Sequence, residues 1–220
     1  MTQIQCYLDD TYRFHSSSEI IDSGSDESGQ WIALKDNIFH PQGGGQPADV
    51  GWVNDIPVRV GRLSADKVIL YPETPLSTMD SIPLTATLSA ADRLLHAALH
   101  TAGHLLNWEM RQYGWMAVSG HHFPGESRVE FSPMGSTAML VDKLPLPLIQ
   151  TNIQALLRDG RPVTTWHEEE TRLCLIEGTE PMPCGGTHVD NLNKITEFSI
   201  KSVKFKKGKL RISYDASHAV

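Results

Sequence analysis

The first part of the chain alternates short apolar runs with polar turn residues, a pattern typical of β-strands. We predict strands in WIALKD (31–36), VNDIPVRV (53–60) and KVILY (67–71), and a polar loop in SGSDESG (23–29). No helical period of apolar residues occurs in this part. We therefore predict that residues 1–80 form a small Gly-rich β domain with a barrel-like sheet.

A long helix is predicted after a connector that is rich in Pro, Ser and Thr (72–83). Ser89 and Asp92 resemble a capping box in which Asp replaces the usual Glu. Apolar residues then recur at spacings of four, three and four on one helical face: Leu95, Leu99, Ala102 and Leu106. Gly114 can end this helix.

The rest of the chain mixes strands with one further helix. This helix is predicted within 144–163, with Pro147 near its start and Gly160 past its end. Strands are predicted at 117–123, 127–133, 162–169 and 171–178, and in a closing hairpin at 197–215 that turns at Lys207-Gly208. Because helices and strands do not alternate strictly, we predict an α+β fold with a second domain at residues 84–220.

Composition limits the class of protein. The chain has 220 residues, 40% of them hydrophobic, which is enough for a substantial core. It has no apolar run long enough to span a membrane. Its start lacks the basic-then-apolar pattern of a signal peptide, so we expect a cytoplasmic protein. Cys6, Cys174 and Cys184 lie far apart in the sequence, and a disulfide is not favoured in that compartment.

The net charge of -7 is unevenly distributed. Residues 1–90 hold 5 basic and 12 acidic side chains, whereas residues 91–220 hold 14 of each. The segment KSVKFKKGKLR (201–211) is locally basic. Such a segment is commonly a solvated hairpin, but a small basic ridge can also bind a phosphate backbone. The candidate residues for this binding are Lys204, Lys206, Lys207 and Lys209.

The long helix carries His96, His100 and His104 at spacings of four. Residues four apart share a helical face, so each neighbouring pair can chelate a metal ion. The segment CGGTH adds Cys184 and His188, and its two glycines permit a tight path that lets both side chains converge. Four ligands of these types suit tetrahedral zinc. The sequence therefore predicts a zinc site from one helical His pair and CGGTH, and leaves open which pair takes part.

Two enzyme classes fit these residues less well. A zincin protease needs Glu directly after the first His of its helical pair, but the residues after the first two histidines are Ala97 and Thr101. A Cys–His hydrolase can use Cys184 as nucleophile and His188 as base, but it leaves the helical histidines unexplained.

A glycine-rich loop, PQGGGQPAD (41–49), lies in the first part of the chain. Consecutive glycines expose backbone N–H groups and let a ligand approach closely. The loop matches neither the Walker pattern nor the dinucleotide-binding pattern. Its central residues are therefore either a substrate loop or a plain structural loop: Gly43, Gly44, Gly45 and Gln46.

Taken in order, PQGGGQPAD, HTAGHLL (100–106) and CGGTHV (184–189) resemble the editing region of alanyl-tRNA synthetase. They resemble the free-standing alanyl-tRNA editing proteins (AlaX type) more closely. The resemblance implies an editing core like those of threonyl- and alanyl-tRNA synthetases. It also implies that zinc is bound by His100, His104, Cys184 and His188. His96 is then a neighbour of the site and not a ligand.

The implied activity is hydrolysis, in trans, of tRNA(Ala) mischarged with serine or glycine. A synthetase pocket rejects such near-isosteres weakly, so a second, hydrolytic site is needed. Candidate catalytic or substrate residues near the motifs are Thr101, Ser119, His121, Arg128 and Thr187. The lysines of 201–211 are then expected to hold the acceptor stem, and the glycine-rich loop to face the site.

Two points stay open at this stage. Zinc either activates water after a ligand such as His188 withdraws, or organises the site while side chains direct the water. Synthetase editing sites carry Thr where this chain has Gly103, and they carry a Gln that AVSGHHF (117–123) lacks. The smaller residue at 103 is expected to widen the pocket. The preference for serine or glycine is therefore undecided. The alternative from another class is a non-catalytic zinc module that binds RNA or a protein.

Overall fold

The computed structural model describes residues 2–76 and 83–219. The predicted domain boundary between 80 and 84 lies at or beyond the edge of the described residues. Half of the predicted connector (72–83) also lies outside them. The domain limits therefore stay a prediction. Within the described part, no helix is both long enough and apolar enough to cross a membrane.

Internal contacts divide the chain into two compact units. The first unit comprises Met1–Gly43 and Pro47–Leu94. The second comprises Gly44–Gln46 and Leu95–Val220, so three residues of the glycine-rich loop belong to the second unit. Each unit has its own cluster of buried apolar side chains.

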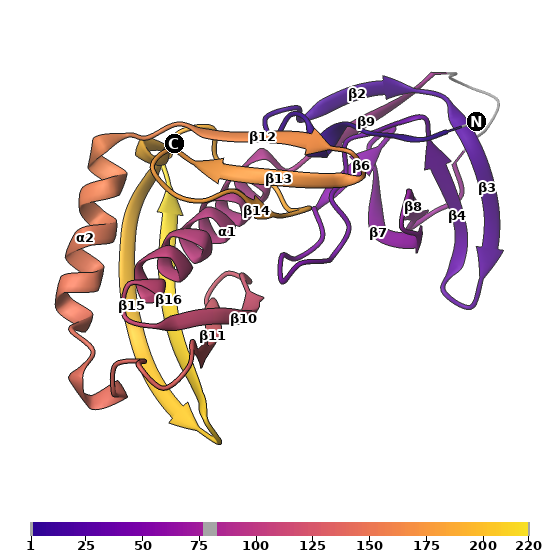
Figure 1. Cartoon of the computed structure of the whole chain (residues 1–220). Helices are drawn as coiled ribbons and strands as arrows, with labels where there is room; N and C mark the ends of the chain where they lie inside the picture. The colour runs from indigo at the N-terminus through magenta and orange to yellow at the C-terminus, as the bar shows by residue number, and fades with distance from the viewer. Residues whose placement is uncertain (1, 77–82, 220) are drawn as a thin grey trace. The chain divides into compact units, whose positions relative to one another are not determined.

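The first unit is built on a seven-stranded antiparallel sheet of order β2-β9-β6-β7-β8-β4-β3 (Figure 1). The strands are β2 His15–Ser18, β3 Ile20–Asp26, β4 Gly29–Leu34, β6 Gly51–Val53, β7 Ile56–Ser64, β8 Lys67–Pro72 and β9 Leu84–Leu88. The short strands β1 (Ile4–Gln5) and β5 (Asp36–Asn37) pair in parallel, and η1 (Cys6–Leu8) is one 3-10 turn.

The barrel-like form predicted for this unit is wrong in one respect, because the sheet is not closed. Its edge strands β2 and β3 do not pair with each other in the described part of the chain. They follow one another directly, with only Glu19 between them. Two consecutive segments without a reversing turn cannot form an antiparallel ladder with each other.

The stretch predicted as one strand at 53–60 is a hairpin. Asn54 and Asp55 form its turn with φ of 46° and 63°, and separate β6 from β7. Two consecutive left-handed residues are the signature of a two-residue hairpin turn, and Asn and Asp tolerate that backbone. The turn signal NDI was therefore present in the sequence.

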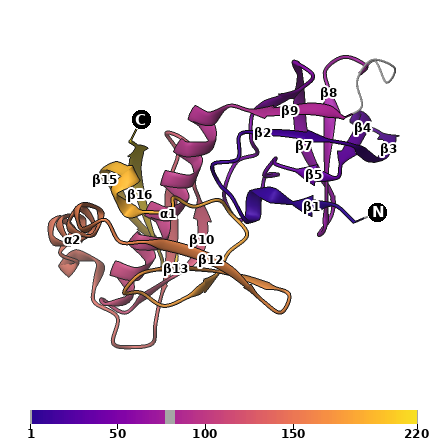
Figure 2. The same ribbon diagram turned by 90° about the horizontal axis from the view of Figure 1, so that it is seen from above.

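The second unit contains a four-stranded antiparallel sheet of order β10-β11-β16-β15 and two helices. The elements are α1 Ala90–Arg111, which begins in the first unit, β10 Trp115–His121, β11 Arg128–Pro133, α2 Leu146–Asp159, β15 Ile195–Lys206 and β16 Lys209–His218. Figures 1 and 2 show α2 running beside the β15–β16 hairpin, and Asn152 of α2 donates to Glu109 of α1 at 3.2 Å. The core of this unit lies where the helices pack against the sheet.

A second, three-stranded sheet carries the segment that leads to CGGTH. It consists of β12 (Val163–Glu168), β13 (Thr171–Ile176) and β14 (Met182–Pro183) in that order. Short 3-10 turns occur at η2 (Val141–Lys143) and η3 (Leu192–Lys194). Cys184 directly follows β14, so the pairing of β14 with β13 fixes the position of the Cys184 backbone.

The predicted start of α1, the end of α2 and the closing turn are confirmed, whereas α1 ends at Arg111, before the predicted Gly114. The Ser89 hydroxyl donates to Asp92 Oδ2 at 2.5 Å at the start of α1. Gly160 ends α2 in the left-handed conformation with φ of 67°. Lys207 and Gly208 form the two-residue turn between β15 and β16, both with positive φ. Such caps and turns are local, which explains why the sequence alone predicts them.

Candidate metal centre

Four side chains of the second unit meet in one cluster. His100 and His104 lie one turn apart on α1, and Cys184 and His188 lie at the two ends of CGGTH. One ligand atom from each of the four residues lies within 4.8 Å of the others. His96, the third histidine of the helix, is buried but lies outside this cluster.

The distances within the cluster suit a tetrahedral metal ion. The Cys184 sulfur lies 3.3 Å from His100 Nε2 and 3.2 Å from His188 Nε2. Zinc bonds of about 2.3 Å to sulfur and about 2.0 Å to nitrogen place two tetrahedral ligand atoms about 3.5 Å apart. The donor set and its spacing therefore fit zinc without a large movement of these side chains.

The tautomer of His188 is fixed by Thr101. The Thr101 hydroxyl has a single proton, which it donates to the Ala97 carbonyl at 2.8 Å. It therefore accepts from His188 Nδ1, which lies 3.1 Å away. Because Nδ1 carries the proton, Nε2 keeps its lone pair and faces the Cys184 sulfur.

Gln46 fixes the tautomer of His100 in the same way. The Thr187 backbone N–H can only donate, and it donates to Gln46 Oε1 at 3.0 Å. The same oxygen lies 2.8 Å from His100 Nδ1, so Nδ1 carries the proton and Nε2 faces the Cys184 sulfur with its lone pair. The Gln46 amide nitrogen donates to the Thr187 hydroxyl at 2.9 Å. Gln46 is completely buried, so it is part of the support of the cluster.

The CGGTH loop can approach α1 only because Gly186 lacks a side chain. A Cβ built on Gly186 would lie 2.0 Å from His100 Cε1 and 2.9 Å from Gln46 Oε1. Gly185 differs, because a Cβ there meets nothing within 4 Å. The second glycine of the motif is thus required by close packing against a cluster residue.

Arg172 holds the loop from β13, and sequence reasoning missed it. One guanidinium nitrogen donates to the carbonyl of Cys184 at 2.8 Å and to that of Gly186 at 2.9 Å. Arg172 is itself buried. Nothing in the sequence TRLCLIEG distinguishes this arginine from a solvated strand residue, because its two acceptors are main-chain atoms more than ten residues away.

Burial controls protonation at the cluster. It lowers the pKa of His104 to about 4, helped by the nearby Arg172 guanidinium, so this imidazole is neutral near pH 7. Burial also raises the pKa of the Cys184 thiol. A bound cation would stabilise the thiolate against this cost. The buried Nδ1 of His104 has no hydrogen-bond partner among the described residues, unlike the corresponding nitrogens of His100 and His188.

A cavity of about 310 Å³ opens beside the cluster. Its lining includes His100, His104 and Cys184 together with Gly44, Ser119, Gly120 and His122. Of the residues predicted near the substrate, Ser119 and Gly44 line this cavity. Thr101 and Thr187 are completely buried, and their hydroxyls take part in the hydrogen bonds that orient His188 and Gln46.

Other predicted residues lie elsewhere. His121 stacks on Phe123 with ring centroids 4.3 Å apart, and Arg128 donates to the Glu126 carbonyl; neither lines the cavity. Gly43 belongs to the first unit, whereas Gly45 packs against β10. A Cβ on Gly45 would lie 2.3 Å from the Gly120 carbonyl oxygen, so this glycine permits close packing of the loop.

His122 occupies the space that the small residue at position 103 was expected to open. A Cβ on Gly103 would lie 2.5 Å from His122 Cε1, so the pocket is not widened there. The His122 ring stacks on that of His100 with centroids 4.6 Å apart and planes at 19°. Sequence reasoning missed this residue, because in GHHF nothing shows which of the two histidines faces inward.

Comparison with known proteins supports the predicted resemblance. No protein-family model matches the chain. The alanyl-tRNA editing protein AlaX-M of Pyrococcus horikoshii is 24% identical over 213 residues, which cover 94% of each chain. The alanyl-tRNA editing protein Aarsd1 of Rattus norvegicus is 26% identical over 211 residues, 88% of this chain and 50% of its own. This chain resembles alanyl-tRNA editing proteins.

The extent of the match differs between these relatives. The chain spans about half the length of the rat protein but nearly all of the archaeal one. An alanine–tRNA ligase of Methanocella arvoryzae is 24% identical over 205 residues, 83% of this chain and 23% of the ligase. The similarity to the editing proteins and to part of a ligase confirms the resemblance that the three motifs predicted.

Proposed function

We propose that this protein is a trans-acting editing hydrolase that deacylates tRNA(Ala) mischarged with serine, with glycine as a second substrate. The observation that carries the proposal is the cluster of three histidines and one cysteine, which opens on a cavity in a chain similar to alanyl-tRNA editing proteins. We further propose that the second unit has the fold of a synthetase editing domain and that the protein acts in the cytoplasm.

We propose zinc as the metal, bound by His100, His104, Cys184 and His188. The Nε2 atoms of His100 and His188, which carry no proton and face the cysteine sulfur, support this choice, because imidazole and thiolate in a tetrahedral set favour zinc. When bound, zinc supplies a Lewis acid next to the cavity. Gln46, Thr101 and Thr187 are positioning residues in this proposal, since they act through the imidazoles.

The remaining residues bind and orient the substrate. The cavity of about 310 Å³ has room for an aminoacyl group, and its wall offers the Ser119 hydroxyl and the backbone of Gly44 and Gly120. The aminoacyl ester is already activated, so positioning the carbonyl and one water accounts for much of the needed acceleration. We propose that Ser119, which is exposed in the open cavity, contacts the substrate directly.

A deacylation assay tests the proposed function. The metal-loaded protein is incubated separately with Ser-tRNA(Ala), Gly-tRNA(Ala) and Ala-tRNA(Ala), and the remaining ester is measured over time. We expect loss of the seryl ester and little loss of the alanyl ester. If none of the three esters is hydrolysed above the rate without protein, the proposal is wrong and the non-catalytic zinc module is favoured.

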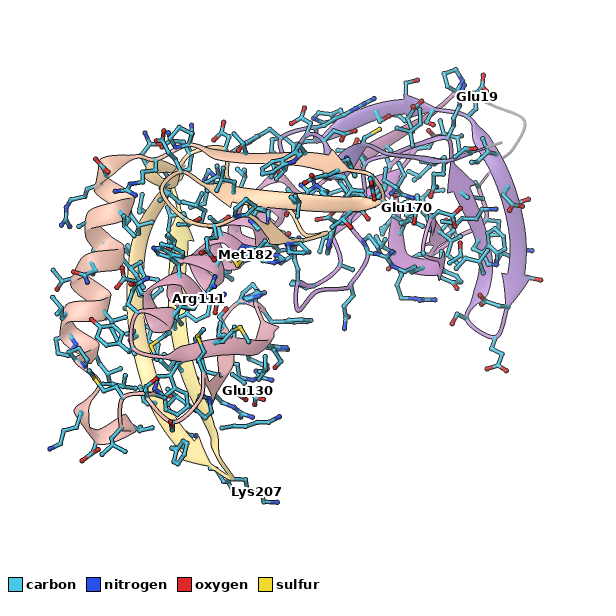
Figure 3. The ribbon with its side chains drawn as sticks, in the orientation of Figure 1. Glu19, Arg111, Glu130, Glu170, Met182 and Lys207 are labelled. Atoms are coloured by element: carbon cyan, nitrogen blue, oxygen red, sulfur yellow. The ribbon has the colours of Figure 1, made fainter. Side chains whose placement is uncertain are left out.

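We propose that the β15–β16 hairpin binds the tRNA backbone. Figure 3 places Lys207 at its tip. A cleft of about 450 Å³ on this hairpin is lined by Lys204, Lys206, Lys207, Lys209, Arg211 and Glu130. Arg211 donates to Glu130 at 3.0 Å and partly neutralises the only acid of the cleft lining, which leaves the lysines as the exposed charge. Such a cationic surface suits phosphates rather than bases.

Neutralising three of these lysines is expected to weaken tRNA binding and reduce its salt dependence. The variant is Lys206→Gln, Lys207→Asn and Lys209→Gln, with Asn at 207 because that position has φ of 53°. Each lost phosphate contact lowers the slope of log K against log salt by about 0.7–0.9, so a change of about 2–3 is expected for three lysines. Binding is measured at several salt concentrations.

The matched control neutralises two exposed lysines outside the cleft, Lys143 and Lys194, each by Gln. The control is expected to keep the slope of the wild type. If the hairpin variant also keeps that slope, the hairpin does not take part in tRNA binding.

A further inference from the structure

His122 is a buried side chain that the cluster does not use as a ligand. Only 5% of its surface is exposed, and that part faces the same cavity as the metal-site residues. Its ring stacks on His100, which fixes the plane of the imidazole. Two glycines make room for it, because a Cβ on Gly103 or on Gly120 would lie 2.5 Å from a ring atom. The chain therefore holds this ring in one place.

The tautomer of His122 follows from its partner Tyr214. The Tyr214 hydroxyl donates its single proton to the Leu99 carbonyl at 2.8 Å. The hydroxyl oxygen lies 2.6 Å from His122 Nδ1, so Nδ1 carries a proton and donates it to this oxygen. The other ring nitrogen, Nε2, then has only a lone pair. It has no hydrogen-bond partner among the described residues and lies beside Gly120, which also lines the cavity.

We propose that His122 Nε2 accepts a hydrogen bond from the side-chain hydroxyl of the seryl ester and so determines the specificity of the cavity. This inference rests on the proposed function and goes beyond it by naming the residue that recognises serine. A neutral hydroxyl suits this place better than the substrate ammonium, because a charge next to a ring that is 5% exposed costs more to desolvate.

The proposal explains how a hydrolytic site can spare the correct product. Alanyl and glycyl esters have no hydroxyl, so neither can make this hydrogen bond to Nε2. One neutral hydrogen bond contributes about 0.5–1.5 kcal/mol net, or roughly 2- to 12-fold in rate. The seryl ester is therefore expected to be preferred over the glycyl and alanyl esters. The preference comes from the contact with His122 and not from the size of the pocket.

Two substitutions separate recognition from structure. In His122→Asn the amide nitrogen takes the place of Nδ1 and can still donate to Tyr214, but no atom replaces Nε2. In His122→Gln the amide reaches the place of Nε2 and can offer an oxygen there. The control is His121→Asn, on the same strand but outside the cavity lining. Metal content is measured for each variant, because His122 touches His100.

The test compares kcat/KM for Ser-tRNA(Ala) and Gly-tRNA(Ala). For His122→Asn with normal metal content, we expect about a 2- to 12-fold loss for the seryl ester, the cost of one hydrogen bond, and no loss for the glycyl ester. His122→Gln should recover part of the seryl activity. Binding of a non-hydrolysable 3′-serylamino-adenosine, compared with its alanyl counterpart, should lose its preference in the Asn variant.

The outcomes distinguish this inference from the proposed function. Equal losses for the seryl and glycyl esters, or an unchanged preference between the two analogues, overturn the role of His122 and leave the hydrolase intact. A wild-type protein that hydrolyses neither ester overturns the proposed function, and the recognition of a seryl ester with it.

Discussion

Replacing Cys184 by alanine is expected to remove the bound metal and the deacylase activity together. The sulfur lies within 3.3 Å of both His100 Nε2 and His188 Nε2, so its loss removes the ligand that contacts two others. Changes to residues that only support a metal ligand cost about 10- to 100-fold, and the loss of a ligand exceeds this. We expect metal per chain to fall close to zero and kcat/KM for Ser-tRNA(Ala) to fall at least about 100-fold.

Metal content is measured by mass spectrometry and activity by ester loss, on the same preparation. The matched control is Cys174→Ala, since Cys174 is a buried cysteine on β13 outside the four-residue cluster. It should keep its metal. A Cys184→Ala protein that retains one metal per chain would show that the cluster is not the metal site.

Gly186→Ala is expected to weaken metal binding although glycine contributes no ligand. The added methyl group would lie 2.0 Å from His100 Cε1 and 2.2 Å from His100 Nδ1, far inside contact distance. Either the His100 ring moves and its hydrogen bond to Gln46 breaks, or the CGGTH loop moves and the Thr187 bond that orients the Gln46 amide breaks. Because these bonds orient His100, we expect about 10- to 100-fold weaker metal affinity.

The matched control is Gly185→Ala, which adds the same methyl group one residue earlier. A Cβ at that position meets no atom within 4 Å. Metal affinity is measured by competition with a chromophoric chelator for both variants and the wild type. Equal affinity of the Gly186 and Gly185 variants would contradict the close packing described here.

Local features of this fold could be predicted from the sequence. The cap at Ser89, the left-handed Gly160 and the turn at Lys207-Gly208 each depend on neighbours within a few residues. The cluster of four side chains that could hold a metal was also predictable, because a His pair four apart on a helix and a Cys–His pair around two glycines are each compact in the sequence. Such signals need no knowledge of distant contacts.

The parts that could not be predicted depend on contacts between distant residues. Gln46 bonds to Thr187, which lies 141 residues later, so its role in the cluster left no local signal. His122 was overlooked in favour of His121, because only the pairing of β10 and the position of Tyr214 decide which ring is buried. The open sheet of the first unit likewise follows from strand order, which alternating apolar residues do not encode.

The glycine-rich loop also restricts how this protein can be recombined. Gly44–Gln46 belongs to the same unit as the four clustered side chains, although residues of the other unit precede and follow it in the chain. A fragment that starts at residue 84 keeps the four clustered side chains but loses the amide that fixes the His100 tautomer. The two units therefore cannot be exchanged independently of each other. A chimera in which another protein supplies the N-terminal part must keep Gly44–Gln46 of this chain.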